Sequence, residues 1–269
     1  MKYLKIETLN IENVLVEMKQ QDLVSKPSRI EVVSLNRPEV KNAFHPGMIA
    51  ELTQYFIEKN KSKLTDLIVL TGEARVFCAG ADLNWMKEMV QYSLEQNIED
   101  SEKLWTMFEA IRNCMVPVIG WVQSAAFGGA LGLMACCDYV MSDVKTQFCF
   151  SEVKLGLAPA VISSFVLEKI SDGQARPLML SAEVFNAETA LKIGLVHHIL
   201  DFSEVSMLQG IKKFLMNGPQ AMIETKKLLN ALKMHPSWSE QKKLTTQVIS
   251  QRRVSSEGQE RLKKFIEKR

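Results

Sequence analysis

Short apolar runs alternate with amphipathic stretches through the first two thirds of the chain. Four of the runs predict buried strands, at residues 30–35, 67–71, 116–122 and 138–142. A helix that begins at Pro46 brings four apolar side chains to one face: Met48, Ile49, Leu52 and Phe56. Residues 83–112 are mostly helical in pattern. Strands that alternate with helices in this way predict an α/β fold.

The pattern becomes helical beyond Gly173. Helices are expected at residues 187–193, 203–217, 219–233 and 237–251. A helical region of this kind cannot bury all of its apolar faces by itself, so we expect it to pack on the core or on another subunit. We therefore divide the chain into an α/β core at residues 1–200 and a helical C-terminal region at residues 201–269.

Two glycines, Gly128 and Gly129, begin an apolar helix that follows the third strand. The first N–H groups of a helix have no partner within it, and the helix dipole favours negative charge there. A second helix start follows the small residues Cys78-Ala79-Gly80-Ala81, and Asp82 is by default its N-cap. N–H groups from the two helix starts could converge on one oxygen, which is what an oxyanion hole requires.

Composition and charge narrow the classes of protein. The chain has 269 residues, of which 46% are hydrophobic, enough for one large domain or a domain with a small appendage. Lys and Arg number 33 against 31 Asp and Glu, so the whole molecule is not an obvious nucleic-acid or membrane binder. Residues 241–269 carry nine Lys or Arg against three Glu, which indicates either a solvated amphipathic helix or an anion-binding tail.

Neither the cysteines nor the histidines are spaced as metal ligands, and no metal site is expected. The five cysteines include no C-x-x-C pair, and the adjacent Cys136 and Cys137 lie in an apolar run that indicates packing. His197 and His198 are adjacent, and the other two histidines stand alone. The chain begins without an apolar or Arg-rich leader and has no run of about 18 apolar residues, so we expect a cytoplasmic protein without a membrane span.

Six segments form a combination that is specific although no single one is. They are Leu35-Asn36-Arg37-Pro38, residues 78–83, Ala126-Phe127-Gly128-Gly129, Cys137-Asp138, residues 151–159, and a tail that runs from Glu257-Gly258 to Arg269. In this order the segments resemble the crotonase family, that is, the enoyl-CoA hydratase/isomerase superfamily. The resemblance implies a crotonase-like spiral of ββα units with a helical C-terminal trimerisation region, and trimers of the family commonly pair into hexamers.

The resemblance also implies the residues of the site. The amides of Ala81 and Gly129 would hold the thioester carbonyl oxygen of an acyl-CoA, with Gly128 beside them. Four residues would lie along the path of the pantetheine and nucleotide groups: Lys41, Ala79, Asp82 and Leu83. Phe265 and Lys268 match a C-terminal Phe and Lys that contact the nucleotide, often from a neighbouring subunit. Coenzyme A is part of the substrate, and no separate cofactor is implied.

Glu152 is the catalytic residue that the resemblance implies. Classical hydratases of the family carry two glutamates, and the first of them falls at Gly132 in this chain. A single carboxylate could deprotonate water for attack at C3 of a 2-enoyl-CoA and then return the proton to C2. It could instead move a proton from C2 to C4 of a 3-enoyl-CoA. The space left by Gly132 is expected to admit a bulkier or branched acyl group.

We favour hydration of a 2-enoyl-CoA over isomerisation. Residues 81–86 and 151–163 resemble bacterial methylglutaconyl-CoA hydratases of leucine breakdown, some of which have glycine at the first glutamate position. Isomerases of the family share the single glutamate and remain the alternative. A non-catalytic homologue that binds acyl-CoA or RNA is a further alternative, whereas a dinucleotide-binding oxidoreductase would need G-x-G-x-x-G. The expected partners are an acyl-CoA thioester and further copies of the chain in a trimer or hexamer, with no nucleic acid and no membrane.

Overall fold

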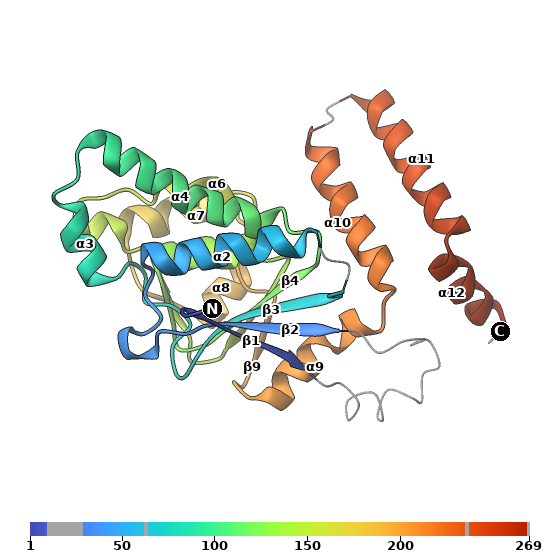
Figure 1. Cartoon of the computed structure of the whole chain (residues 1–269), viewed down its shortest axis with the longest axis horizontal. Helices are drawn as coiled ribbons and strands as arrows, with labels where there is room; N and C mark the ends of the chain where they lie inside the picture. Colours follow the sequence, from blue (N-terminus) through green and yellow to red (C-terminus); the bar gives the residue numbers. More distant parts are fainter. Residues whose placement is uncertain (10–28, 62–63, 235–236, 268–269) are drawn as a thin grey trace.

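Two β-sheets form the centre of the molecule (Figure 1). The computed structural model describes residues 1–9, 29–61, 64–234 and 237–267. The larger sheet contains, in spatial order, β1 (Leu4–Leu9), β2 (Ile30–Leu35), β3 (Leu67–Gly72), β4 (Val118–Val122), β6 (Tyr139–Asp143) and β9 (His198–Leu200). The smaller sheet contains β5 (Ala125–Phe127), β7 (Gln147–Cys149) and β8 (Phe185–Asn186). Strands β2, β3, β4, β6 and β9 are parallel, which is the sheet of an α/β fold.

Successive turns of the chain repeat one unit of two strands and a helix. Strands β4 and β5 lead into α5 (Gly129–Cys136), and β6 and β7 lead through η3 (Glu152–Leu155) into α6 (Ala160–Val166). Strand β4 pairs with β6 in the larger sheet, while β5 pairs with β7 in the smaller one. Each of these two turns therefore gives one strand to each sheet and then a helix. This arrangement is the spiral of ββα units that the sequence predicts.

The stretch 83–112, predicted to be mostly helical, forms two helices, α3 (Leu83–Met89) and α4 (Leu94–Arg112). Ser93 separates them because it forms a capping box with Gln96 and so begins a new helix. The helix at Pro46 is α2 (Pro46–Lys59), and His45 caps it by accepting a hydrogen bond from the Met48 amide at 3.1 Å. Several short elements were not predicted, among them the helices α6 (Ala160–Val166) and α7 (Asp172–Ser181) and the strands β5, β8 and β9.

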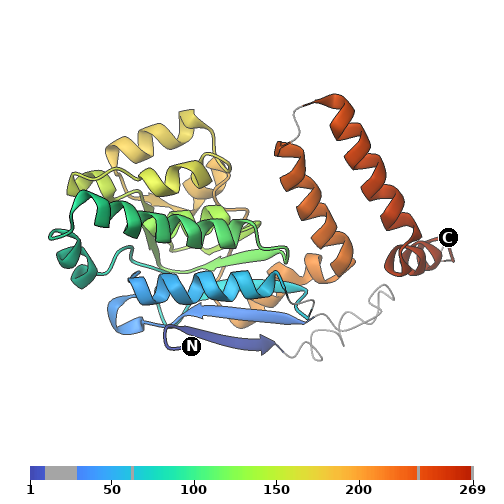
Figure 2. The ribbon, with the colours of Figure 1, turned by 45° about the horizontal axis from the view of Figure 1, so that its top comes forward.

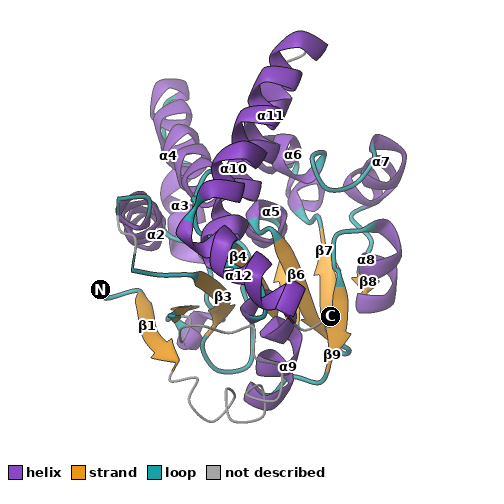
Figure 3. Cartoon of the chain, turned by 90° about the vertical axis from the view of Figure 1, so that its right-hand side faces the viewer, coloured by secondary structure: helices purple, strands orange, loops and turns teal. Residues whose placement is uncertain are grey.

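Alternate residues of the central strands face two different layers of helices (Figures 1 and 3). Val33 and Leu35 of β2 pack with α2, α4 and α5, in the main core. Ile30 and Val32 of the same strand face the other way and pack with α9 (Glu204–Leu215). This alternation follows from the two-residue period of a strand, and it buries β2 on both faces. The face next to α2, α4 and α5 is the one that carries the candidate site.

The last three helices form an arm that extends away from the sheets (Figures 1 and 2). They are α10 (Pro219–Met234), α11 (Trp238–Val254) and α12 (Ser256–Glu267). Within their described residues, α11 and α12 contain no buried side chain. A helical C-terminal region is therefore present, as predicted. No helix in the described part of the chain is long and apolar enough to cross a membrane.

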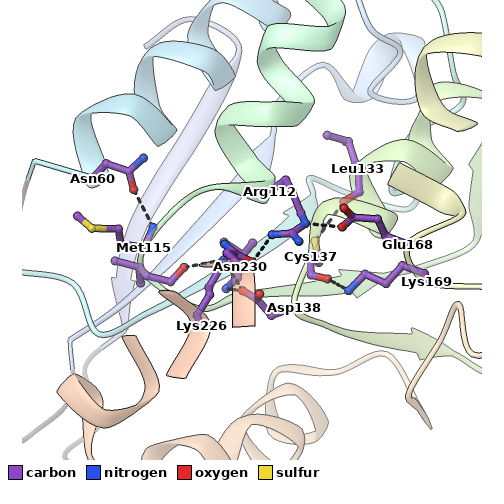
Figure 4. A network of polar contacts seen from close by, with 12 residues as sticks. Asn60, Arg112, Met115, Leu133, Cys137, Asp138, Glu168, Lys169, Lys226 and Asn230 are labelled. Atoms are coloured by element: carbon purple, nitrogen blue, oxygen red, sulfur yellow. Dashed lines mark hydrogen bonds and ion pairs between the residues drawn. The ribbon is translucent and has the colours of Figure 1, made fainter. Parts of the chain in front are cut away.

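Polar contacts at one face of α10 hold the arm to the core (Figure 4). The buried Lys226 donates to Asp138 Oδ2 at 2.6 Å and to the Val116 carbonyl at 3.3 Å. One turn further along α10, Asn230 accepts a hydrogen bond from Arg112 at 2.6 Å. A cleft of about 760 Å³ remains between α10 and the core, so α10 does not pack tightly against the core along this face. The polar contacts of Lys226 and Asn230 therefore contribute to holding α10 in place.

Replacing Lys226 by Met removes the ammonium group and keeps most of the aliphatic stem. We expect the free energy of unfolding to fall by about 1–3 kcal/mol, measured by urea denaturation. The loss stays below that of a fully buried pair because the Asp138 side chain is 34% exposed and still accepts from the Val118 amide. As the matched control, Lys227→Met at an exposed i,i+3 pair should change stability by less than about 0.5 kcal/mol. Equal losses in the two variants would contradict this account.

Candidate active site

The segment 78–82 is held in place by hydrogen bonds to the small sheet. The Cys78 amide donates to the Ala125 carbonyl at 3.2 Å, and the Cys78 carbonyl accepts from the Phe127 amide at 3.2 Å. Gly80 also lies against Phe127, because a Cβ at position 80 would be 3.1 Å from the Phe127 carbonyl oxygen. Gly80 has a φ of +96°, a conformation that glycine adopts without strain.

The Ala81 amide is left without a partner by the bonds on either side of it. Phe44 donates to the Gly80 carbonyl at 2.7 Å and accepts from the Asp82 amide at 2.8 Å. Because the C=O and N–H of a trans peptide point in opposite directions, the Ala81 N–H points away from Phe44. In the described part of the chain, no acceptor is bonded to this N–H group.

Gly129, the first residue of α5, provides a second amide that no acceptor among the described residues binds. The Gly128 amide donates to the Cys149 carbonyl at 2.9 Å, and the Gly128 carbonyl accepts from the Leu131 amide at 2.9 Å. That carbonyl points into the helix, so the Gly129 N–H points out of its N-terminal end. Gly128 has a φ of +53°, which disfavours any residue with a side chain there.

Glu152 lies directly beside this helix start. A Cβ placed on Gly128 would be 3.2 Å from Glu152 Oε1, so only a glycine leaves the carboxyl group this close to the main chain. Oε2 of Glu152 is buried and has no hydrogen-bond partner among the described residues. Burial raises the pKa of the Glu152 carboxyl above its usual value, although its own backbone amide opposes the change. A buried carboxyl group with a raised pKa is a candidate for general acid–base chemistry.

Asp82 is tied into the protein by an ion pair and by its helix. Its carboxylate accepts from Arg37 at 2.7 Å and from the Asn84 amide at 2.8 Å, which makes it the N-cap of α3. Burial alone would raise the pKa of Asp82, but the hydrogen bonds from Arg37, Asn84 and Trp85 together lower it. Arg37 also donates to the Ala43 carbonyl at 2.8 Å, so the pair connects the segment that carries Ala81 to the turn before α2.

The other predicted substrate contacts lie in different parts of the structure. The Lys41 carbonyl accepts from the Ala79 amide at 3.1 Å, so the turn at Lys41 and the segment 78–82 are adjacent. Leu83 follows at the start of α3, where its side chain is 74% exposed. Phe265 is on α12, at the opposite end of the molecule from α3 (Figure 1). Lys268 lies outside the described residues.

The expectation that Gly132 leaves space for an acyl group is wrong. A Cβ at this position would be 2.5 Å from Ile162 Cγ2 and 2.8 Å from Phe108 Cζ. Gly132 is the place where α4 and α6 approach α5, and only a residue without a side chain permits that approach. The position of the missing first glutamate is therefore filled by carbon atoms.

Sequence reasoning missed the side chains that surround the two free amides. The main chain of Phe44 forms hydrogen bonds with Gly80 and Asp82, and the Phe44 ring would be 3.4 Å from a Cβ on Gly129. Phe108 and Ile162 fill the space at Gly132. A signal existed only for Arg37, which belongs to one of the segments that carry the family resemblance. In the sequence, Phe44, Phe108 and Ile162 have the pattern of ordinary core residues. The residues next to them in the chain do not indicate what their side chains contact.

No resident metal is indicated by the geometry: in the described ranges, no group of three or more His, Cys, Asp or Glu side chains is arranged to hold an ion. All five cysteines belong to the described part and are buried and unpaired, which confirms the packing role expected for Cys136 and Cys137. Two free amides beside a partly buried carboxyl group instead match an enzyme that stabilises an oxyanion and moves a proton.

Comparisons with known proteins agree with this class. The family model for enoyl-CoA hydratase/isomerase matches residues 25–269. The structure of an enoyl-CoA hydratase from Shewanella pealeana is 36% identical and covers 94% of this chain and 97% of its own, with a TM-score of 0.83. A Legionella pneumophila structure assigned to the crotonases is 33% identical, with the same TM-score, and covers 100% of this chain and 97% of its own. Enoyl-CoA hydratase ACTT6 of Alternaria alternata is 31% identical over 78% of this chain and 70% of its own.

The chain belongs to the enoyl-CoA hydratase/isomerase family. The fold is the crotonase fold, as the sequence resemblance implies.

Replacing Asp82 by Asn tests the ion pair with Arg37. Because the pKa of Asp82 is lowered in the folded protein, its contribution is present above the unfolded pKa of about 3.9 and is lost as pH falls through the lower folded value. We expect Asp82→Asn to cost about 2 kcal/mol at pH 7 and much less near pH 3, by denaturant titration at both pH values. As the control, Asp201→Asn at an exposed position should leave the free energy of unfolding unchanged at both pH values. A cost that is constant with pH would contradict the assignment.

Proposed function

We propose that this protein adds water across the double bond of a 2-enoyl-CoA thioester. The observation that carries the proposal is the carboxyl group of Glu152 at the start of α5: Oε1 lies beside Gly128, and the buried Oε2 has no partner among the described residues. The named hydratases among the relatives support the same reaction class. In this assignment the thioester carbonyl oxygen accepts hydrogen bonds from the Ala81 and Gly129 amides.

The two amides act where negative charge develops. Attack of water at C3 moves the π electrons of the double bond toward the thioester carbonyl and forms an enolate. Each donor directed at that oxygen contributes about 3 kcal/mol to lowering the barrier. Because both donors belong to the main chain and are fixed by bonds on either side, they need no reorganisation during the reaction.

Glu152 performs both proton transfers in this mechanism. Its carboxylate takes a proton from water as the oxygen–C3 bond forms, and the resulting carboxylic acid delivers that proton to C2 of the enolate. The raised pKa suits both steps, because the group is a stronger base when ionised and still loses its proton readily.

A second candidate is isomerisation of a 3-enoyl-CoA, and one observation favours it. The apolar contacts of Phe108 and Ile162 at Gly132 leave no place for a second acid. Isomerisation needs only one group, which removes a proton from C2 and returns it at C4. A non-catalytic acyl-CoA or RNA binder is the weakest alternative, because it gives no role to the buried Oε2 of Glu152, which has no partner among the described residues.

Assembly into a homotrimer or hexamer belongs to the same proposal. The arm exposes large apolar side chains, among them Trp238 at 87%, Val254 at 79% and Phe265 at 54%. Faces of this kind favour contact with another copy of the chain. Since α12 lies far from the segment 78–82 of its own chain, Phe265 would reach a nucleotide only at a neighbouring subunit (Figure 1).

Glu152→Gln keeps the shape of the side chain and removes its acid–base chemistry. We expect kcat to fall by about 10²–10⁴-fold with crotonyl-CoA, 3-methylglutaconyl-CoA or a 3-enoyl-CoA, whichever the native enzyme converts. The fall of native kcat/KM at acidic pH should lie above the ordinary glutamate pKa of about 4.3, because the base must be ionised and its pKa is raised. Glu88→Gln, at an exposed site on α3, is the control. Product analysis decides the reaction: double-bond migration without hydration would replace hydratase by isomerase, and full activity of Glu152→Gln would remove Glu152 from the mechanism.

Removing residues 251–269 tests the role of the arm. We expect the solution mass, measured by light scattering, to fall toward that of one chain and the KM for acyl-CoA to rise by about tenfold, a loss of about 1.4 kcal/mol of binding. Phe265→Ala should raise KM with less effect on mass. An unchanged mass together with an unchanged KM would contradict both parts of the proposal.

A further inference from the structure

We propose that Phe108 and Ile162 restrict this enzyme to short, uncharged acyl groups, because their side chains fill the space at Gly132 next to the proposed oxyanion hole. The inference rests on the proposed function, because it takes the thioester oxygen to bind at the Gly129 amide. It adds two specificity-determining residues and a substrate class to that function.

The geometry of α5 places position 132 next to the proposed oxyanion hole. Gly129 and Gly132 are three residues apart and share one face of the helix. Position 132 lies about 4.5 Å further along the axis, since each residue of a helix advances it by about 1.5 Å. Phe44 covers this face at Gly129, and Phe108 and Ile162 cover it at Gly132. An acyl group that extends from the oxyanion hole along this face therefore meets the two side chains within one helical turn.

The two side chains are held too firmly to move aside. Phe108 is fully buried and Ile162 is 2% exposed. The Phe108 ring packs against Phe165 with 5.6 Å between centroids and against Phe44 with 6.5 Å. The Phe165 ring in turn packs against Trp105, with 4.9 Å between ring centroids. Phe108 and Ile162, with the aromatic rings behind them, therefore form a wall that is several rings thick. Close packing of this kind resists displacement by a longer ligand.

The chemistry of the wall also discriminates against charge. Phe108 and Ile162 present only carbon atoms at Gly132, and a carboxylate pressed against them would lose its hydration without gaining a partner. An uncharged acyl end loses nothing of this kind. The wall therefore favours crotonyl-CoA over 3-methylglutaconyl-CoA, whose acyl group ends in a carboxylate.

Steady-state kinetics across a chain-length series tests the proposal. The measured quantity is the ratio of kcat/KM for 2-decenoyl-CoA to that for crotonyl-CoA. The native enzyme should give a ratio well below one, and Ile162→Ala and Phe108→Leu should each raise it by about tenfold or more, as added pocket volume does in apolar sites. Met107→Ala is the control, because Met107 is equally buried on the same helix as Phe108 but points about 100° away from it.

A second variant separates the effect of volume from that of general loosening. In Gly132→Ala/Ile162→Ala, the new methyl group occupies space that Ile162 Cγ2 has vacated, because the two positions would be 2.5 Å apart in the native chain. The Phe108 ring, whose Cζ would be 2.8 Å from the methyl group, shifts into the remainder of that space. The ratio should return toward the native value. A ratio that stays high in this double variant would show that the wall does not act through space at Gly132.

The proposal is overturned if the native enzyme prefers 2-decenoyl-CoA or 3-methylglutaconyl-CoA. It is also overturned if Ile162→Ala converts crotonyl-CoA normally with an unchanged ratio. Calorimetric binding of the saturated butyryl-CoA and decanoyl-CoA gives the same comparison without turnover. If no enoyl-CoA is converted but butyryl-CoA still binds more tightly, the proposed reaction fails and the length restriction holds.

Discussion

The candidate site depends on two main-chain N–H groups, those of Ala81 and Gly129, that no acceptor among the described residues binds. The peptide between Gly80 and Ala81 gives its carbonyl to Phe44, and the peptide between Gly128 and Gly129 gives its carbonyl to Leu131. Planar trans peptides then direct each N–H group away from the bond that its carbonyl makes, and at Gly129 this is out of the N-terminal end of α5, which lies beside Glu152. Neither donor is a side chain that could rotate, so the polarity of the site is a property of the fold itself.

Gly132 has two effects that the sequence alone does not connect. Gly132 removes the first acid of a classical hydratase, and it also lets α4 and α6 pack directly on α5. The side chains that enter are Phe108 and Ile162, so the loss of a polar group is matched by a gain of apolar contact. Where a classical hydratase has a carboxyl group that needs hydration, this chain has close-packed carbon atoms that exclude water.

The sequence predicts the features that depend on local pattern. Strand β2 and helix α2 follow from periodicity over a few residues, and the glycines at positions 128 and 129 indicate a helix start directly. Strand β5 could not be predicted, because three residues form a strand only by pairing with β7. The filling of the space at Gly132 could not be predicted either, since Phe108 and Ile162 lie more than twenty residues away along the chain and meet Gly132 only after the spiral has closed.

The three-helix contact at Gly132 limits which substitutions this position accepts. A glutamate at position 132 would place its first side-chain atom 2.5 Å from Ile162 Cγ2 and 2.8 Å from Phe108 Cζ, so it does not fit while both side chains remain. Shrinking either residue alone opens a cavity and costs stability without adding an acid. A second acid at this position therefore requires at least two substitutions made together, one on α5 and one on α4 or α6, and no single mutation supplies it.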